Sequence, residues 1–155
     1  MVIATVLLAA ATSLAPVLGA TAPWANASGP PQTAGRVTVV DVFTFSCINC
    51  KHVTPELQRL RAKYHASDLA IVGVHAPELP QERVHANVVQ ALHEQDITWP
   101  VVFDDDFKVW NAYGVEAWPT QLVFDRHGKL RAKYVGEGYD AQLEQTVRAL
   151  VAERT

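Results

Sequence analysis

From Arg36 onward, short runs rich in Val and Phe alternate with segments whose apolar residues recur at helical spacing. The runs show little polar alternation, which is typical of strands covered on both faces in a parallel or mixed sheet. The order of segments predicts three strand–helix pairs, then a hairpin and a last helix. The sequence therefore predicts an α/β fold, a mixed sheet flanked by helices on both faces. We expect strands at 36–45, 69–75, 99–103, 120–124 and 130–135, and helices at 50–64, 81–95, 106–113 and from Asp140 onward.

The composition permits a packed domain and argues against several classes of protein. Hydrophobic residues make up 49% and charged residues 19% of the 155 positions, which is unlike a disordered chain. The net charge of −3 gives no basic surface, so we do not expect nucleic-acid binding. The 2 cysteines cannot form a disulfide-dense scaffold, but they can form a single disulfide.

The N-terminal segment differs from the rest of the chain. No charged residue or histidine precedes Arg36, and residues 2–20 are rich in Ala, Val and Leu. An apolar helix of this length nearly spans a bilayer, and Ala25-Asn26-Ala27 fits a small-x-small cleavage site. We interpret residues 1–27 as a signal peptide or N-terminal anchor, 28–35 as a linker and 36–155 as the folded domain. Because the usual basic n-region is missing, a start further upstream is an open alternative.

The motif Cys47-Ile48-Asn49-Cys50 lies where a predicted buried strand meets a helix. The first turn of a helix has unpaired N–H groups and the positive end of the helix dipole, which stabilise a thiolate at Cys47 and lower its pKa. Cys50, one turn later, can resolve a mixed disulfide formed by Cys47. This spacing also occurs in zinc sites, but zinc needs further ligands and the chain has no second C-x-x-C. We therefore predict a redox pair and no metal site, with a purely structural disulfide as the remaining alternative.

Further residues around this motif resemble the thioredoxin superfamily over residues 36–155. Asp41 stands six positions before Cys47, where thioredoxins carry a buried acid, and Pro55 matches the proline of their active-site helix. Trp118-Pro119-Thr120 is similar to the cis-proline loop, and Gly136 to the glycine that lets a substrate backbone approach the groove. The resemblance implies a thioredoxin-like fold in which Trp118, Pro119 and Gly136 bind substrate.

Other features of the sequence resemble a particular branch of this superfamily. An extra helix and strand before Trp118 resemble the exported TlpA/ResA-like proteins. The segments 44–50 and 74–78 are similar to the thioredoxin-like domain of DipZ-type proteins. The resemblance implies an exported, periplasmic or extracytoplasmic thiol–disulfide oxidoreductase that reduces protein disulfides without a cofactor. It also implies a CcdA-type membrane electron donor, here a separate protein, with membrane contact only through the N-terminal segment.

Some residues depart from the thioredoxin pattern, and others have two interpretations. Ser46 replaces the usual tryptophan before the first cysteine, and Ile-Asn replaces Gly-Pro between the cysteines. The reduction potential of thioredoxin therefore cannot be assigned to this chain. Asp41 lies on an apolar strand, where burial raises its pKa and suits it to accept the Cys50 proton; alternatively it faces solvent or pairs with Lys63. Trp118 either shapes the groove or packs in the core.

Two other functions remain open from the residues alone. Thr44 stands three positions before Cys47, as in the peroxidatic loop of peroxiredoxins, but Val40 occupies the proline position of that loop. A thioredoxin-fold copper chaperone would use the two cysteines with a histidine such as His75. His75 and Glu78, at the end of the predicted second strand, are also interpreted as part of the active-site rim, with a satisfied loop histidine as the alternative for His75. The acidic run at 104–106 is interpreted as a helix start.

Overall fold

The computed structural model describes residues 9–153. Its elements follow the predicted alternation, preceded by two short elements, α1 and β1, that the sequence did not indicate. The elements are α1 (Ala15–Leu18), β1 (Trp24–Ala25), β2 (Val37–Phe43), α2 (Ile48–Lys63), β3 (Leu69–His75), the 3-10 helix η1 (Pro80–Arg83), α3 (His85–Glu94), β4 (Val101–Phe103), α4 (Lys108–Ala112), β5 (Thr120–Phe124), β6 (Leu130–Val135) and α5 (Asp140–Ala152).

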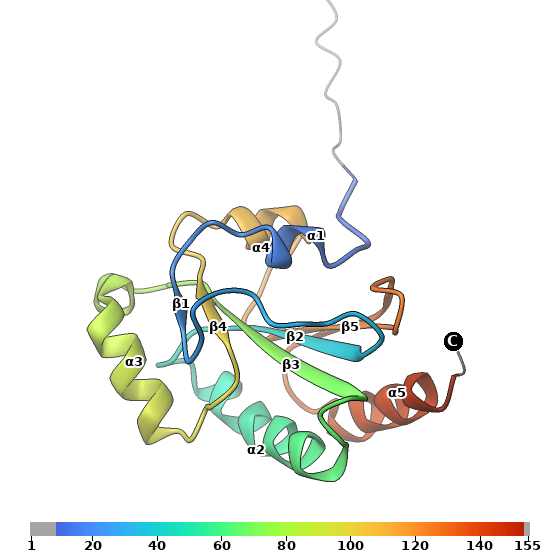
Figure 1. Ribbon diagram of the computed structural model, residues 1–155. Helices are drawn as coiled ribbons and strands as arrows, with labels where there is room; N and C mark the ends of the chain where they lie inside the picture. The colour runs from blue at the N-terminus through green and yellow to red at the C-terminus, as the bar shows by residue number, and fades with distance from the viewer. Residues whose placement is uncertain (1–8, 154–155) are drawn as a thin grey trace, which may run out of the picture.

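The strands form one six-stranded sheet in the order β1-β4-β3-β2-β5-β6 (Figure 1). Strands β2, β3 and β4 run parallel, whereas β5 and β6 form an antiparallel hairpin beside β2. Strand β1 pairs antiparallel with β4 at the other end of the sheet. The predicted mixed sheet with helices on both faces is therefore confirmed.

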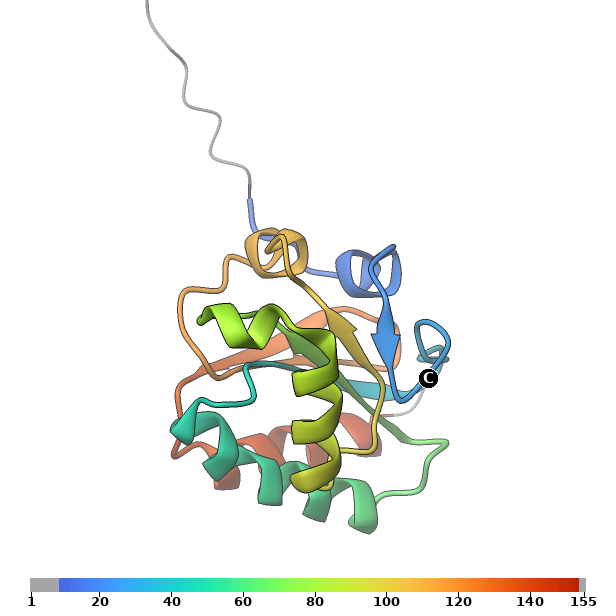
Figure 2. The same cartoon turned by 90° about the vertical axis from the view of Figure 1, so that its left-hand side faces the viewer.

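An apolar layer on each face of the sheet holds the fold together (Figures 1 and 2). Helices α2, α3 and α5 cover one face, and α1 and α4 cover the other. Every residue of β2 and β3 is buried, as expected for strands that lie between two helical layers. Along β2, Val39 and Phe43 point toward α2, while Val40 and Val42 point toward α4. Strand alternation thus places Asp41 on the α2 side of the sheet.

One predicted helix is interrupted. The segment 81–95 forms two elements, η1 and α3, because Val84 between them has an extended backbone with φ −84° and ψ 104°. The apolar spacing of Val84, Val88 and Leu92 predicted one continuous face. Val88 and Leu92 are buried as predicted, but Val84 is 50% exposed. The interruption therefore changes which side chains of this segment reach the core.

The described part of the N-terminal segment packs against the sheet. Leu14 and Val17 are buried in the layer that contains α4, and Ser13 forms a β-bridge with Lys129. Strand β1 adds to the sheet edge, where the Asn26 side chain donates to the Ile97 and Trp99 carbonyls. Packed structure therefore extends well before residue 36. The signal-peptide or anchor interpretation of residues 1–27 stays a prediction, and residues 1–8 lie outside the described part of the chain.

No helix within residues 9–153 combines the length and the apolar character needed to span a membrane.

Candidate active site

The two cysteines lie at the start of α2, directly after β2. Cys47 is the N-cap residue with an extended backbone, and its Sγ accepts a hydrogen bond from the Cys50 amide at 3.3 Å. Cys47 is half-buried and Cys50 is buried, and both are free thiols. The helix start therefore presents one sulfur toward solvent and holds the other beneath it.

The topology brings the predicted site residues to the same edge of the sheet. Cys47 follows the carboxyl end of β2, and β3 and β4 end at this edge because they run parallel to β2. Strand β5 runs the opposite way, so Pro119 immediately before it reaches the same edge, as does Gly136 immediately after β6. In open α/β sheets this is the edge at which ligands bind.

Pro119 and Gly136 contact each other across the ends of β5 and β6. The Trp118–Pro119 peptide bond is cis, and the Gly136 amide donates to the Pro119 carbonyl at 2.8 Å. Gly136 has φ +89°, a left-handed conformation that other residues rarely adopt. A Cβ at this position would meet nothing within 4 Å, so the backbone conformation rather than crowding requires glycine.

Trp118 is half-buried beside the proline and tied to the loop after β3. Its indole Nε1 donates to the Ala76 carbonyl at 2.8 Å. Its ring lies 4.4 Å from that of Trp110, centroid to centroid. One side of the ring thus packs within the fold, while the remaining surface is exposed at the site's edge. The core interpretation therefore describes part of this side chain, and its role in a substrate groove stays a prediction.

Asp41 is buried on β2 and faces the same layer as Cys50. Burial raises the pKa of Asp41 to about 7, although the Gln121 amide donates to its Oδ1 at 2.8 Å and partly opposes the rise. Lys63 instead pairs with Glu144 on α5, so the alternative Lys63 pairing is wrong. The sequence did not single out Gln121. The signal was present, since Gln121 is a polar residue in an apolar strand directly opposite Asp41 in the β2–β5 register.

Cys50 holds its proton strongly in this environment. Burial raises the pKa of the Cys50 thiol well above its ordinary range, and the hydrogen bond with Cys47 and the charge of Asp41 act in the same direction. An acid that titrates near pH 7 therefore lies close enough to Cys50 to influence its ionisation.

Two buried side chains hold the turn before Cys47 from the β3 side. His75 is fully buried; its Nε2 accepts from the Phe45 amide at 3.3 Å, and burial lowers its pKa to about 4. Glu82 in η1 is also fully buried and accepts from Ser46 Oγ. Nothing in the sequence indicated Glu82, because its burial depends on how η1 folds back over the sheet edge. Glu78, expected near the rim, is exposed.

These contacts bear on the two alternative functions. His75 Nε2 faces the Phe45 amide and lies 3.4 Å from Thr44 Oγ1, so this nitrogen is engaged away from the cysteines. The same contact turns the Thr44 hydroxyl toward His75. Within residues 9–153, no three His, Cys, Asp or Glu side chains converge as a metal-binding group. Neither the copper nor the peroxidatic interpretation gains support from this geometry.

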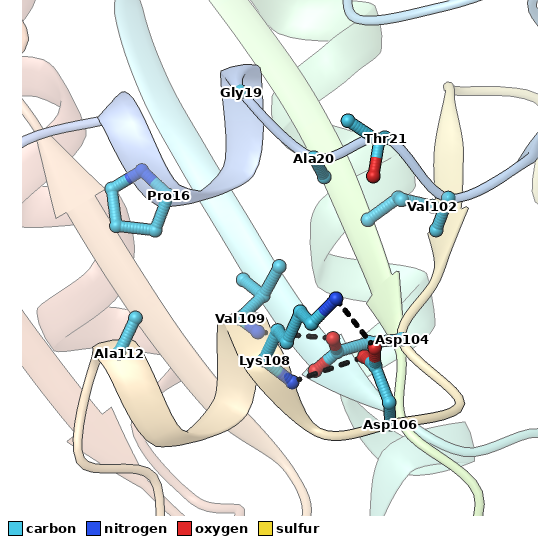
Figure 3. Close-up of a pocket in the computed structure, with 11 residues that line it drawn as sticks. Pro16, Gly19, Ala20, Thr21, Val102, Asp104, Asp106, Lys108, Val109 and Ala112 are labelled. Atoms are coloured by element: carbon cyan, nitrogen blue, oxygen red, sulfur yellow. Dashed lines mark hydrogen bonds and ion pairs between the residues drawn. The ribbon is translucent and has the colours of Figure 1, made fainter.

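A cavity of about 340 Å³ lies elsewhere, between α1, β4 and α4 (Figure 3). Asp104 at its wall is buried, and its carboxylate accepts from the Val109 and Trp110 amides at 2.9 and 2.8 Å. This agrees with the prediction that the acidic run begins a helix. Lys108 pairs with Asp106 at 3.1 Å. The cavity belongs to the apolar layer opposite the one that contains Cys50.

The mixed sheet, the cysteine pair at a helix start and the cis-proline beside it define a thioredoxin-fold protein. The sequence profile of the Redoxin family matches residues 27–150, and the chain belongs to this family. A solution structure of a thioredoxin-like protein in the oxidized form is similar, with a TM-score of 0.79 and 28% identity, covering 93% of this chain and 97% of that one.

Two curated relatives show how the chain compares with full-length proteins. Protein DipZ of Mycobacterium tuberculosis is 32% identical over 142 residues, which is 88% of this chain but 20% of DipZ. The thiol-disulfide oxidoreductase YkuV of Bacillus subtilis is 31% identical over 118 residues, covering 76% of this chain and 79% of YkuV. The chain spans only 11–20% of the length of the larger relatives. The family resemblance stated from the sequence is thus confirmed.

Proposed function

We propose that this chain is a thiol–disulfide oxidoreductase that reduces disulfides in other proteins. The observation that carries the proposal is the division of roles at the start of α2. Cys47 is accessible at the helix N-cap, whereas Cys50 is buried beneath it beside an acid whose pKa is raised to about 7. The relative YkuV, which is named a thiol-disulfide oxidoreductase and has a similar length, supports the oxidoreductase part of this proposal.

The reaction moves two electrons through two exchange steps. The Cys47 thiolate attacks one sulfur of the substrate disulfide, so a mixed disulfide forms and the other substrate sulfur leaves as a thiolate. Cys50 then loses its proton and attacks Cys47 Sγ, which releases the second substrate thiolate. The protein ends with a Cys47–Cys50 disulfide, and the substrate ends with two thiols.

Asp41 is the proposed acceptor of the Cys50 proton. A general base works best when its pKa lies near the working pH, and burial brings the pKa of Asp41 to about 7. Gln121 keeps the carboxyl oriented through its 2.8 Å hydrogen bond. The transfer lets a deeply buried thiol become a nucleophile only when the mixed disulfide needs to be resolved.

Trp118, Pro119 and Gly136 are the proposed substrate-binding residues. They lie at the sheet edge where Cys47 emerges, and the Gly136–Pro119 hydrogen bond fixes the two loops relative to each other. An extended substrate segment can pair with the backbone there, as a β-strand added at an edge. The open space at the Gly136 Cα leaves room for this approach.

The test is a trap for the mixed disulfide. A Cys50→Ser variant incubated with a disulfide-containing protein such as insulin is expected to accumulate a covalent adduct through Cys47. The matched Cys47→Ser variant is expected to form none, and the wild type to reduce insulin. Absence of adducts together with absence of insulin reduction would overturn the proposal.

The exported location and a CcdA-type electron donor are further parts of this proposal. A structural neighbour described as a pneumococcal exposed lipoprotein thioredoxin supports the location, at 25% identity and a TM-score of 0.64.

The packing of Leu14 and Val17 favours retention of the N-terminal segment over cleavage after Ala27. Mass spectrometry of the mature protein from a bacterial host tests this, and loss of residues 1–27 would contradict retention. The donor is tested by the thiol state of Cys47 and Cys50 in cells with and without a CcdA-type protein.

A further inference from the structure

The carboxylate of Glu82 is fully buried without a basic partner. No Lys or Arg within residues 9–153 forms an ion pair with it, and its partners are hydrogen-bond donors from two loops. Oε1 accepts from Ser46 Oγ, while Oε2 accepts from the Glu78 and Leu79 amides at 2.6 and 2.8 Å. A buried charge is costly unless such bonds compensate it, so this arrangement is a built site for one carboxylate.

Glu82 carries its negative charge at neutral pH. Burial alone opposes ionisation, but the hydrogen bonds from Ser46 and the backbone amides outweigh it and lower the pKa of Glu82 below its ordinary value. The neighbouring His75 is uncharged at neutral pH, because burial lowers its pKa to about 4. His85 and Asp105 pair with each other nearby through a 2.6 Å contact. Lys51 and Glu94 line a surface pocket together with Phe45 and Ser46, so they also lie near the turn. Glu82 is the charged group that forms a hydrogen bond to the turn.

Residues 44–46 form the turn between β2 and Cys47, and each of them takes part in a hydrogen bond. Ser46, adjacent to Cys47, is held by Glu82. The Phe45 amide donates to His75 Nε2 at 3.3 Å, and the Phe45 carbonyl accepts from Gln95 Nε2 at 3.1 Å. The Thr44 carbonyl accepts from the Cys47 amide at 3.3 Å. Among the described contacts to this turn, Glu82 supplies the charged one.

We propose that Glu82 is a positioning residue for Cys47, which holds the preceding turn through Ser46 and places a fixed negative charge against the residue that precedes the nucleophile. A negative charge disfavours a nearby thiolate, and a destabilised dithiol form is a stronger reductant. Glu82 would thus bias the site toward reducing its substrates. This inference rests on the proposed function, because it takes Cys47 as the nucleophile.

Two substitutions in the full chain separate the charge from the tether. Glu82→Gln keeps an oxygen for Ser46 but removes the charge. We expect its Cys47–Cys50 disulfide to be at least threefold easier to reduce at equilibrium with glutathione, about 14 mV toward more positive potential. In a Cys50→Ser background we also expect the midpoint of Cys47 alkylation to move to lower pH. Ser46→Ala keeps the charge, so we expect an unchanged midpoint but at least threefold slower mixed-disulfide formation.

Glu78→Gln is the matched control, since Glu78 is an exposed acid on the same loop, and we expect wild-type values for it. A folded Glu82→Gln protein with the wild-type glutathione equilibrium and alkylation midpoint would overturn the charge effect. Should Glu82→Gln not fold, wild-type adduct kinetics in Ser46→Ala would overturn the positioning role. Failure of the wild type to form adducts or reduce insulin would instead refute the proposed function, so the two failures are distinguishable.

Discussion

Replacing Asp41 by Asn is expected to make the protein more stable at alkaline pH while slowing its redox cycle. A pKa raised from 3.8 to about 7 in the folded protein means that holding the charge in the core costs about 4 kcal/mol. The penalty is absent below pH 3.8, where both folded and unfolded states are protonated. It grows as pH rises toward 7, because the unfolded chain ionises first, and is complete above that value.

Urea unfolding of the reduced proteins at pH 5 and pH 8 measures this effect. The free energy of unfolding of Asp41→Asn minus that of the wild type is expected to increase by roughly 2–3 kcal/mol between these pH values. Taking the change between two pH values removes the constant effect of the new amide on the Gln121 hydrogen bond. A difference that stays flat from pH 5 to pH 8 would refute the argument that Asp41 titrates near 7. In the same variant, resolution of the mixed disulfide by Cys50 is expected to slow and to lose its pH dependence near 7.

Three further substitutions test other features of the structure. Gly136→Ala forces a side chain into a left-handed conformation, so thermal or urea unfolding should show a loss of about 1–2 kcal/mol, together with weaker binding of extended substrates. Val17→Ala is expected to cost about 1–2 kcal/mol, while the half-exposed Val89→Ala costs little; equal losses would contradict the packing of the N-terminal segment. Asp125→Asn is the opposite case to Asp41. Burial opposes its ionisation, but bonds from the Lys129 amide and Arg131 lower its pKa, so the wild type should lose its stability advantage over this variant as pH falls, in urea titrations from pH 7 to pH 3.

The sheet was largely predictable because its central strands are short runs rich in Val and other apolar residues. The predicted bounds of β3, β5 and β6 agree with the structure residue for residue. The N-terminal segment was harder to interpret, because its composition is ambiguous. An Ala/Val/Leu-rich segment without charge has the same appearance whether it inserts in a membrane or covers a sheet face, and here Leu14 and Val17 cover the face formed in part by Val40 and Leu122.

The arrangement of the candidate site was predictable to the extent that its residues are adjacent in sequence or lie on one strand. Cys47 and Cys50 share one helix turn, and Asp41 lies on the strand that leads to it. Glu82 was not predictable, because its partners Ser46 and Glu78 come from two loops brought together only in the folded chain. Local spacing does not report such long-range contacts.

The placement of Asp41 in β2 also restricts how this protein can vary. Neighbouring strand residues face opposite sides, so sliding β2 by a single residue would turn the acid toward α4 and present a valine to Cys50. Such a slip leaves the hydrophobicity of the strand almost untouched, yet it separates the acid from both Gln121 and the thiol. The phase of β2, and not only its composition, therefore decides whether a well-packed relative of this chain keeps a buried acid on the side of the sheet that faces Cys50.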